Sequence, residues 1–102
     1  MEFHIDSQTK QGIITINDEI SIQDSKKFKE LFNQAANETN NIIIDFENVS
    51  YIDLSFFQLL YAAQQKCKAL KKGIFFKESS IDFIKKSVNE AGFSHSITVN
   101  SI

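Results

Sequence analysis

Two residues with usable chemistry follow the most apolar run of this sequence. The run Ile42-Ile43-Ile44 is typical of a buried strand, and a short loop then leads to Asp53 and Ser55. Asp53 has the side chain of a helix N-cap, which places Ser55 in the first helical turn, near unpaired backbone N–H groups. A phosphate on Ser55 would add about −1.5 to −2 charges there. The pattern fits an electrostatic switch, and it also fits an unmodified helix start.

Other kinds of reactive site find little support. The three glycines, Gly12, Gly73 and Gly92, are too far apart in the sequence to build a phosphate-binding loop. His4 and His95 have no cysteine or acidic residues at metal-ligand spacing. The Ser-His-Ser sequence around His95 has no strand-to-helix nucleophile turn beside it. We therefore expect no catalytic residue, no cofactor and no metal ligand.

A cysteine and four lysines lie together near residue 70. Cys67 falls on the inner stripe of the expected helix, so we interpret it as a small buried hydrophobe rather than a reactive thiol. Lys66, Lys68, Lys71 and Lys72 suit the negative end of that helix. An anion-binding or membrane-surface role for these lysines is the alternative.

Length and charge limit the class of protein. With 102 residues, the chain supports one domain spanning residues 1–102. The formal net charge of −2 argues against a nucleic-acid partner, which usually requires a basic excess. No signal peptide or membrane span is visible, so we expect a cytoplasmic protein that does not insert into membranes.

Alternation of apolar and polar residues predicts the strands. Ile14 with Ile16, and Ile20 with Ile22, indicate two half-buried strands around a turn at Asn17-Asp18. The other expected strands are 3–6, 42–46 and 74–76, with a short strand or a loose tail after Ser94.

Apolar stripes at helical spacing predict three helices. The first spans 24–37 with Asp24 or Ser25 as its cap, the second opens at Asp53 and spans 54–72, and the third spans 80–91. Gly73 and Gly92 are the expected left-handed caps. The fold class is therefore α/β: a mixed sheet of four to five strands with three main helices, in the order β-β-β-α-β-α-β-α.

The same residues resemble the STAS domain family, whose pattern is a strand ending in an acidic residue, a short loop, and Asp-Ser-Ser-Gly opening a long helix. The strand and loop at 43–49 and the helix entry Tyr51-Ile52-Asp53-Leu54-Ser55 are similar to this pattern. The similarity continues through Gln58-Leu59-Leu60, Lys71-Lys72-Gly73 and residues 89–93. Leu54 and Phe56 depart from the pattern, which often has Ser and Gly there.

The resemblance implies regulation by binding and no enzymatic activity. Anti-sigma factor antagonists of this family bind an anti-sigma serine kinase and lose affinity when a serine at the helix entry is phosphorylated. Transferred to this chain, that serine is Ser55, and Asp53 is the acidic residue before it. The expected partner is an anti-sigma-type serine kinase or another signalling protein. The alternative is a small STAS subunit of a phospholipid-transport ABC complex, docked on its ATPase.

The second helix also supplies a candidate partner surface. At 100° per residue, Phe57, Tyr61 and Leu54 fall on its flank and outer side, within two turns of Ser55. We expect Leu54 and Tyr61 to be exposed, whereas Phe57 either joins them or packs against a neighbouring helix. The expected partner-binding residues are therefore Asp53, Leu54, Ser55, Phe57, Gln58 and Tyr61.

Overall fold

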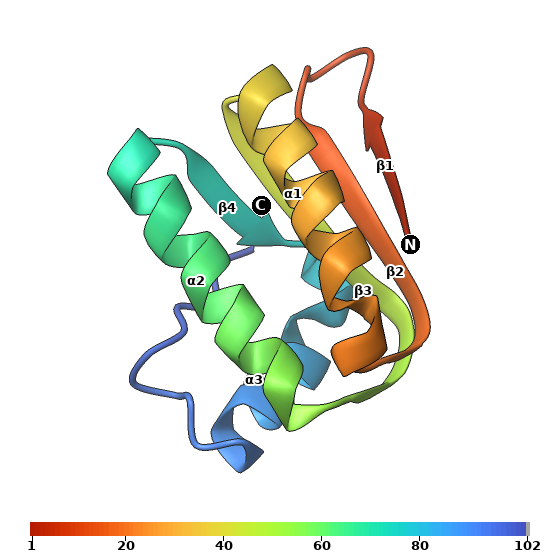
Figure 1. Cartoon of the computed structure of the whole chain (residues 1–102), viewed down its shortest axis with the longest axis vertical. Coiled ribbons are helices and arrows are strands. Elements are labelled where there is room, and N and C mark those ends of the chain that lie inside the picture. The colour runs from red at the N-terminus through yellow and green to blue at the C-terminus, as the bar shows by residue number, and fades with distance from the viewer. Residues whose placement is uncertain (102) are drawn as a thin grey trace.

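The computed structural model describes residues 1–101, which form a four-stranded sheet and three helices (Figure 1). Short 3₁₀ turns, η1 and η2, precede the first and last helices. The elements in chain order are β1 (Glu2–Ile5), β2 (Gly12–Ile20), η1 (Ile22–Asp24), α1 (Ser25–Glu38), β3 (Asn41–Ile52), α2 (Leu54–Leu70), β4 (Gly73–Phe76), η2 (Glu78–Ser80) and α3 (Ile81–Glu90).

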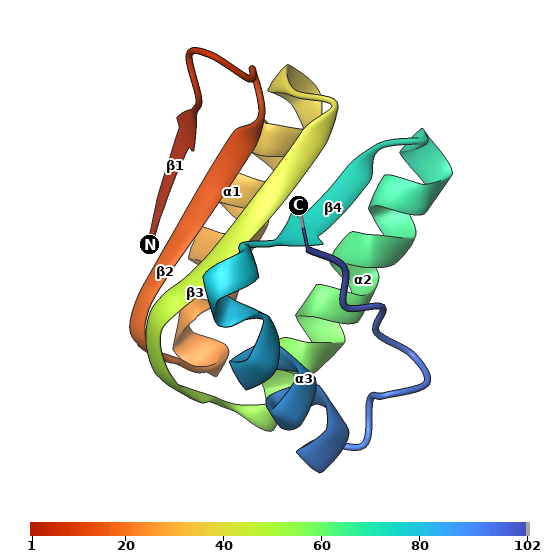
Figure 2. The ribbon, with the colours of Figure 1, turned by 180° about the vertical axis from the view of Figure 1, so that it is seen from behind.

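The strands lie side by side in the order in which the chain forms them. β1 is antiparallel to β2, and β2, β3 and β4 are parallel to one another. The β2-α1-β3 and β3-α2-β4 crossovers step in the same direction, and such crossovers share one hand, so both helices cover the same face. Figure 1 shows α1 and α2 in front of the sheet, and Figure 2 shows η2 and α3 on the opposite side.

The mixed sheet and the three helices confirm the fold class predicted from the sequence. One strand of the predicted order is wrong, because the observed order is β-β-α-β-α-β-α. Residues 12–20 form a single strand, and Ile22 begins η1 rather than a second strand. Asp18 does adopt a left-handed φ of 62°. The irregularity is absorbed as shifts in the β2–β3 register on either side of Asn17 and Asp18, so the strand bends without turning back.

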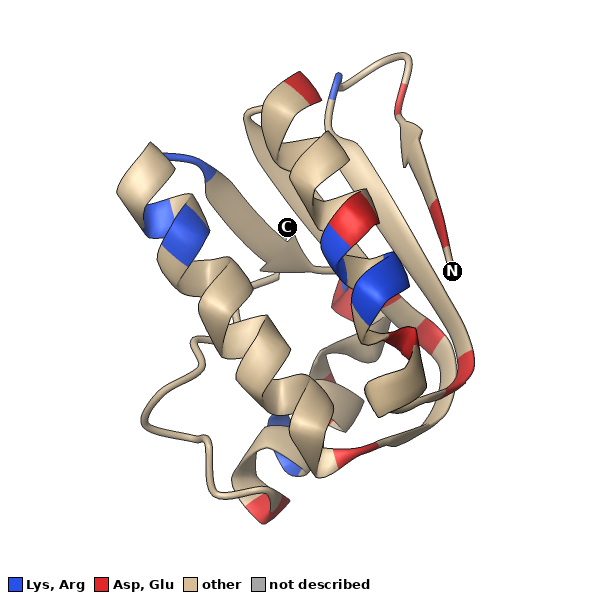
Figure 3. Cartoon of the chain, in the orientation of Figure 1, with Lys and Arg blue, Asp and Glu red and all other residues tan. Residues whose placement is uncertain are grey.

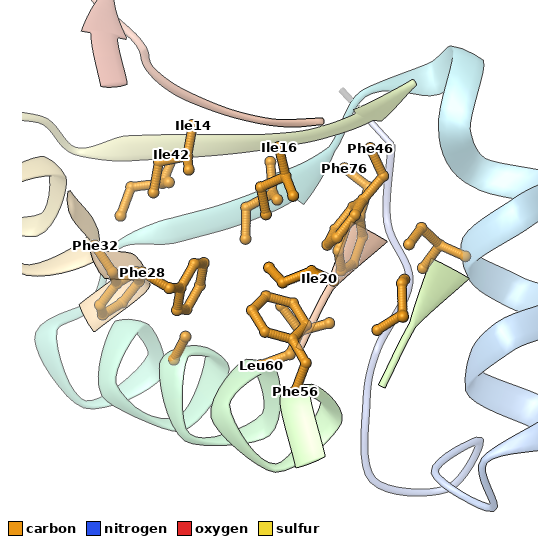
Figure 4. Packing of buried hydrophobic residues seen from close by; sticks show 14 of the residues in the cluster. Ile14, Ile16, Ile20, Phe28, Phe32, Ile42, Phe46, Phe56, Leu60 and Phe76 are labelled. Atoms are coloured by element: carbon orange, nitrogen blue, oxygen red, sulfur yellow. The ribbon is translucent and has the colours of Figure 1, made fainter. Parts of the chain in front are cut away.

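Phenylalanine fills the space between the sheet and the two helices on its front face. Phe28 of α1, Phe46 of β3, Phe56 of α2 and Phe76 of β4 are buried together with isoleucines of β2 and β3 (Figure 4). The Phe46 ring lies 6.0 Å from both Phe56 and Phe76, measured between centroids. This aromatic core fixes the first turn of α2 relative to the end of β3.

The two ends of α1 differ in how side chains support them. Asp24 precedes the helix as predicted, but its carboxylate accepts from the backbone N–H of Ser21 at 2.8 Å and so closes η1. At the other end, the Lys72 ammonium donates to the carbonyls of Ala36 and Thr39, the latter at 2.9 Å. A cation therefore occupies the negative end of α1.

The left-handed residue that ends α2 is Lys71, with φ of 58°, so the prediction that Gly73 supplies this cap is wrong. Gly73 instead begins β4 and lies under the Phe75 ring. A Cβ at position 73 would come within 2.6 Å of that ring. A larger residue at position 73 would therefore force the side chains of Asn41 and Phe75 to move.

The predicted end of α3 is confirmed. Gly92 has a φ of 79°, and the N–H of Phe93 folds back onto the Val88 carbonyl at 2.9 Å. The following tail makes one isolated bridge, between Phe76 and Ser101, so it is closer to the predicted loose tail than to a strand. Residue 102 lies outside the described residues.

Candidate functional site

Asp53 caps α2, as the sequence predicted. The N–H of Ser55 donates to the Asp53 carboxylate at 3.1 Å, and the N–H of Phe56 donates to the Asp53 carbonyl at 2.9 Å. The N–H of Asp53 donates to the Ile20 carbonyl, also at 2.9 Å, which ties the cap to the end of β2. The start of α2 is therefore fixed both to its own first turn and to the sheet.

The Ser55 side chain does not lie open at the helix terminus. Its Oγ atom is buried and has no hydrogen-bond partner among residues 1–101. Ser55 lies one turn before Leu59, on the same flank of α2. Leu59 lines a hollow of about 220 Å³ between α1 and α2, so this flank faces α1. The sequence placed the serine correctly on the helix but did not show that its hydroxyl is covered.

Exposed apolar side chains surround the start of α2. Leu54 is 56 % exposed and Tyr61 is 39 % exposed, which confirms the predicted exposure of both, and Gln58 is exposed between them. Tyr51, at the end of β3, is 55 % exposed and was not predicted as a site residue. Ile52, the next residue of β3, is buried, so Tyr51 points to the opposite side of the strand.

Phe57 belongs to the core, which contradicts its expected place among the exposed residues of the partner surface. It is only 2 % exposed, and its ring stacks on Phe93 with centroids 5.9 Å apart and planes at 26°. Phe93 follows the Gly92 cap of α3. The alternative reading, in which Phe57 packs beside the third helix, is therefore the correct one.

A hollow of about 400 Å³ separates the end of β3 and the start of α2 from α3. Its apolar lining residues are Tyr51, Ile52, Leu54, Phe57, Phe83 and Ala91. Lys86 and Glu90, one turn apart on α3, add one charge of each sign. Tyr51 and Leu54 thus lie at the edge of a recess rather than on a flat surface.

Acidic residues of β3 are paired away from the α2 start. The Lys77 ammonium lies 2.7 Å from the Glu47 carboxylate and 3.5 Å from that of Asp45. The hydrogen bond to Glu47, with the Asp45 charge beside it, raises the pKa of Lys77. Glu47 is therefore paired with Lys77. Figure 3 shows α2 without charged residues along its first turns and with lysines near its C-terminal end.

Cys67 is fully buried, as predicted, and its burial raises the pKa of the thiol. Of the four nearby lysines, two are bound within the molecule: Lys66 donates to the Asn33 side chain at 2.7 Å, and Lys72 holds the end of α1. Lys68 and Lys71 are exposed. The lysines therefore serve in part to join α2 to α1.

Neither metal-ligand geometry nor membrane-spanning helices were found among the described residues. Residues 1–101 contain no group of three or more His, Cys, Asp or Glu side chains arranged to hold a metal ion. None of the helices in that range is both long enough and apolar enough to cross a bilayer.

Known structures resemble this fold over nearly all of its length. An anti-sigma factor antagonist, SpoIIAA in its unphosphorylated form, is 18 % identical with a TM-score of 0.62, and the match covers 98 % of this chain and 89 % of that one. The Bacillus cell fate determinant SpoIIAA in its phosphorylated form is 16 % identical with a TM-score of 0.66, and the match covers 98 % and 92 % of the two chains. No curated protein matches the sequence.

The family model for the STAS domain matches residues 4–101. That range includes all three helices and the whole sheet except the first two residues of β1. The chain belongs to the STAS domain family.

Proposed function

We propose that this chain is a non-catalytic regulatory domain that binds a protein partner through the start of α2 and weakens that binding when Ser55 is phosphorylated. One observation carries the proposal: Leu54 and Tyr61 are exposed on α2 near Ser55, which lies in the first turn that Asp53 caps. Exposed apolar residues gathered at one place mark interaction surfaces more often than scattered ones do. We further propose that the domain acts in the cytoplasm without a cofactor.

The solved relatives support a switch of this kind. SpoIIAA is described as an anti-sigma factor antagonist and has been solved both with and without phosphate. By the family resemblance, the serine that is phosphorylated at the helix entry in such proteins corresponds to Ser55. By that analogy, the partner is an anti-sigma-type serine kinase or another signalling protein.

The chemistry of the α2 start accounts for release. A phosphate on Ser55 would add about −1.5 to −2 charges directly after the Asp53 carboxylate. Two negative groups would then lie beside an apolar contact surface, and a partner would have to desolvate both in order to bind. Leu54 and Tyr61 supply the apolar contact, and Asp53 and Gln58 supply polar contacts at its edge.

Affinity capture from the native cell tests the proposal. Wild type, Ser55→Ala and Ser55→Asp are used as baits, and captured proteins are identified by mass spectrometry. The Ser55→Ala bait should retain the partner, and Ser55→Asp should retain less of it, although a carboxylate carries less charge than a phosphate. The affinity of the identified partner is then measured against authentic phosphoprotein.

Two results would contradict the proposal. The first is equal partner affinity for wild type, Ser55→Asp and the phosphoprotein. The second is stable capture of a transport ATPase irrespective of the residue at position 55, which would favour the role of a constitutive ABC-complex subunit.

A further inference from the structure

Ser55 carries the one side-chain nitrogen or oxygen atom that is both buried and unpaired within residues 1–101. A buried hydroxyl without a partner destabilises the folded state relative to a paired one. The hydroxyl at the proposed switch is therefore buried without a compensating hydrogen bond. It is also the atom that a kinase has to reach.

Phosphorylation imposes a geometric requirement on this hydroxyl. The reaction forms a bond from Ser55 Oγ to the γ-phosphorus of ATP and breaks the bond from that phosphorus to ADP, while the hydroxyl proton passes to a base of the kinase. Attacking and leaving oxygens lie roughly in line, so Oγ must stand clear of the protein surface. The buried position of Oγ does not allow such an approach.

The backbone around Ser55 is held in place by Asp53. Its carboxylate binds the N–H of Ser55, its carbonyl binds the N–H of Phe56, and its own N–H is bound by Ile20. Since the Ser55 flank faces α1, loosening of the first turn would allow the hydroxyl to turn outward. Loss of the Asp53 side chain removes one of the bonds that close this turn.

We propose that Ser55 is a gated acceptor: its hydroxyl becomes accessible only when the first turn of α2 opens, and the Asp53 cap sets how often that happens. The biological meaning of the gate rests on the proposed phosphorylation of Ser55. The gate itself is a property of this chain and is measurable without any kinase. A kinase that uses this site then has to bind the open turn rather than the closed one.

The experiment replaces the hydroxyl by a thiol and measures its alkylation. Ser55→Cys is treated with iodoacetamide, and modification at each position is followed over time by peptide mass spectrometry. Gln65→Cys, at an exposed position of the same helix, serves as the accessible control. Each rate is divided by the rate of the same thiol in the urea-unfolded chain, which removes differences in intrinsic reactivity.

Native Cys67 provides an internal reference for global unfolding, because its side chain is buried. The thiol at position 55 should react at least tenfold more slowly than the thiol at position 65. Adding Asp53→Ala should accelerate position 55 by about fivefold, the change expected for the loss of an N-cap worth about 1 kcal/mol. Asp53→Asn should restore the slow rate, since Asn caps as well as Asp does. Cys67 should remain slow throughout.

Several results would overturn the gate. Equal reactivity at positions 55 and 65 would show that the hydroxyl position is already open. Slow reaction at position 55 that Asp53→Ala leaves unchanged would show that access does not depend on the cap. Equal acceleration of position 55 and Cys67 would show that only global unfolding has been measured. Failure of the gate would leave the proposed switch intact, because that switch is tested by partner affinity.

Discussion

The Phe56 ring meets the Phe28 ring edge to face, with centroids 4.9 Å apart and planes at 76°. This contact joins the first turn of α2 to α1 directly beside Ser55. Phe56 occupies a position where the family pattern often has glycine. In this chain, the position next to the candidate switch is thus part of the core.

Replacing Phe56 should therefore destabilise the whole domain. We expect Phe56→Ala to lower the free energy of unfolding by about 3–5 kcal/mol, because a fully buried aromatic side chain leaves a cavity. Urea denaturation followed by circular dichroism measures the change. Phe56→Leu should lose clearly less, and a loss below about 1 kcal/mol for the alanine variant would be incompatible with this packing.

At the left-handed residue that ends α2, a substitution should stabilise the domain. Lys71 adopts a φ of 58°. This conformation is unfavourable for any residue that has a Cβ atom and nearly neutral for glycine. Lys71→Gly should therefore raise the free energy of unfolding by roughly 0.5–1 kcal/mol. Lys68→Gly, in the last turn of the same helix, is the matched control and should destabilise by about 1 kcal/mol. Destabilisation by both variants would refute this assignment of the cap.

The exposed residues at the start of α2 should contribute to binding and not to folding. Tyr61→Ala and Leu54→Ala should change the free energy of unfolding by less than about 0.5 kcal/mol. The affinity of the identified partner should fall, and an aromatic anchor commonly costs about 2 kcal/mol or more. Gln65→Ala, on the same helix, should change neither quantity. Reduced stability with unchanged affinity of the folded fraction would place both residues in the core.

Cys67 predicts a loss of stability at alkaline pH. Burial raises the pKa of its thiol above the ordinary value of 9.0, so the folded chain keeps the proton at pH values where the unfolded chain releases it. This stability is complete below the ordinary pKa and declines as pH rises from there towards the folded-state pKa.

Thermal unfolding between pH 7 and pH 10.5 tests this prediction. Cys67→Ala should have a lower Tm at neutral pH, because it leaves a cavity, but its Tm should fall less steeply above the ordinary thiol pKa. Parallel Tm curves for the two proteins would show that the thiol makes no such contribution.

Local sequence signals were sufficient for the helices and for two of their ends. The apolar stripes predicted α1, α2 and α3 to within two residues at nearly every boundary, and Asp53 and Gly92 act as predicted. These features depend on residues that are close in sequence, so a helical period or a capping side chain is sufficient to predict them. Contacts between residues far apart in the sequence could not be predicted in this way.

Three features that depend on distant contacts were misassigned or left open by the sequence. The turn residues at Asn17-Asp18 end no strand, because pairing with the long β3 carries β2 through the irregularity. The helical projection placed Phe57 correctly on a flank of α2, but only the fold shows that Phe93 covers that flank. In the same way, the position of Ser55 was evident from the sequence, whereas burial of its hydroxyl depends on how α2 packs.

The strand order β1-β2-β3-β4 also bears on how the chain folds during synthesis. Each strand that leaves the ribosome finds its neighbour already made, so the sheet can grow at one edge without insertion between existing strands. The last pairing step has to wait for residues 100 and 101, because the Asn100 carbonyl accepts the N–H of Phe76 at 2.8 Å and Ser101 bridges to the same residue. A nascent chain lacking those residues would leave the Phe76 end of β4 unpaired, and an unpaired strand edge favours aggregation.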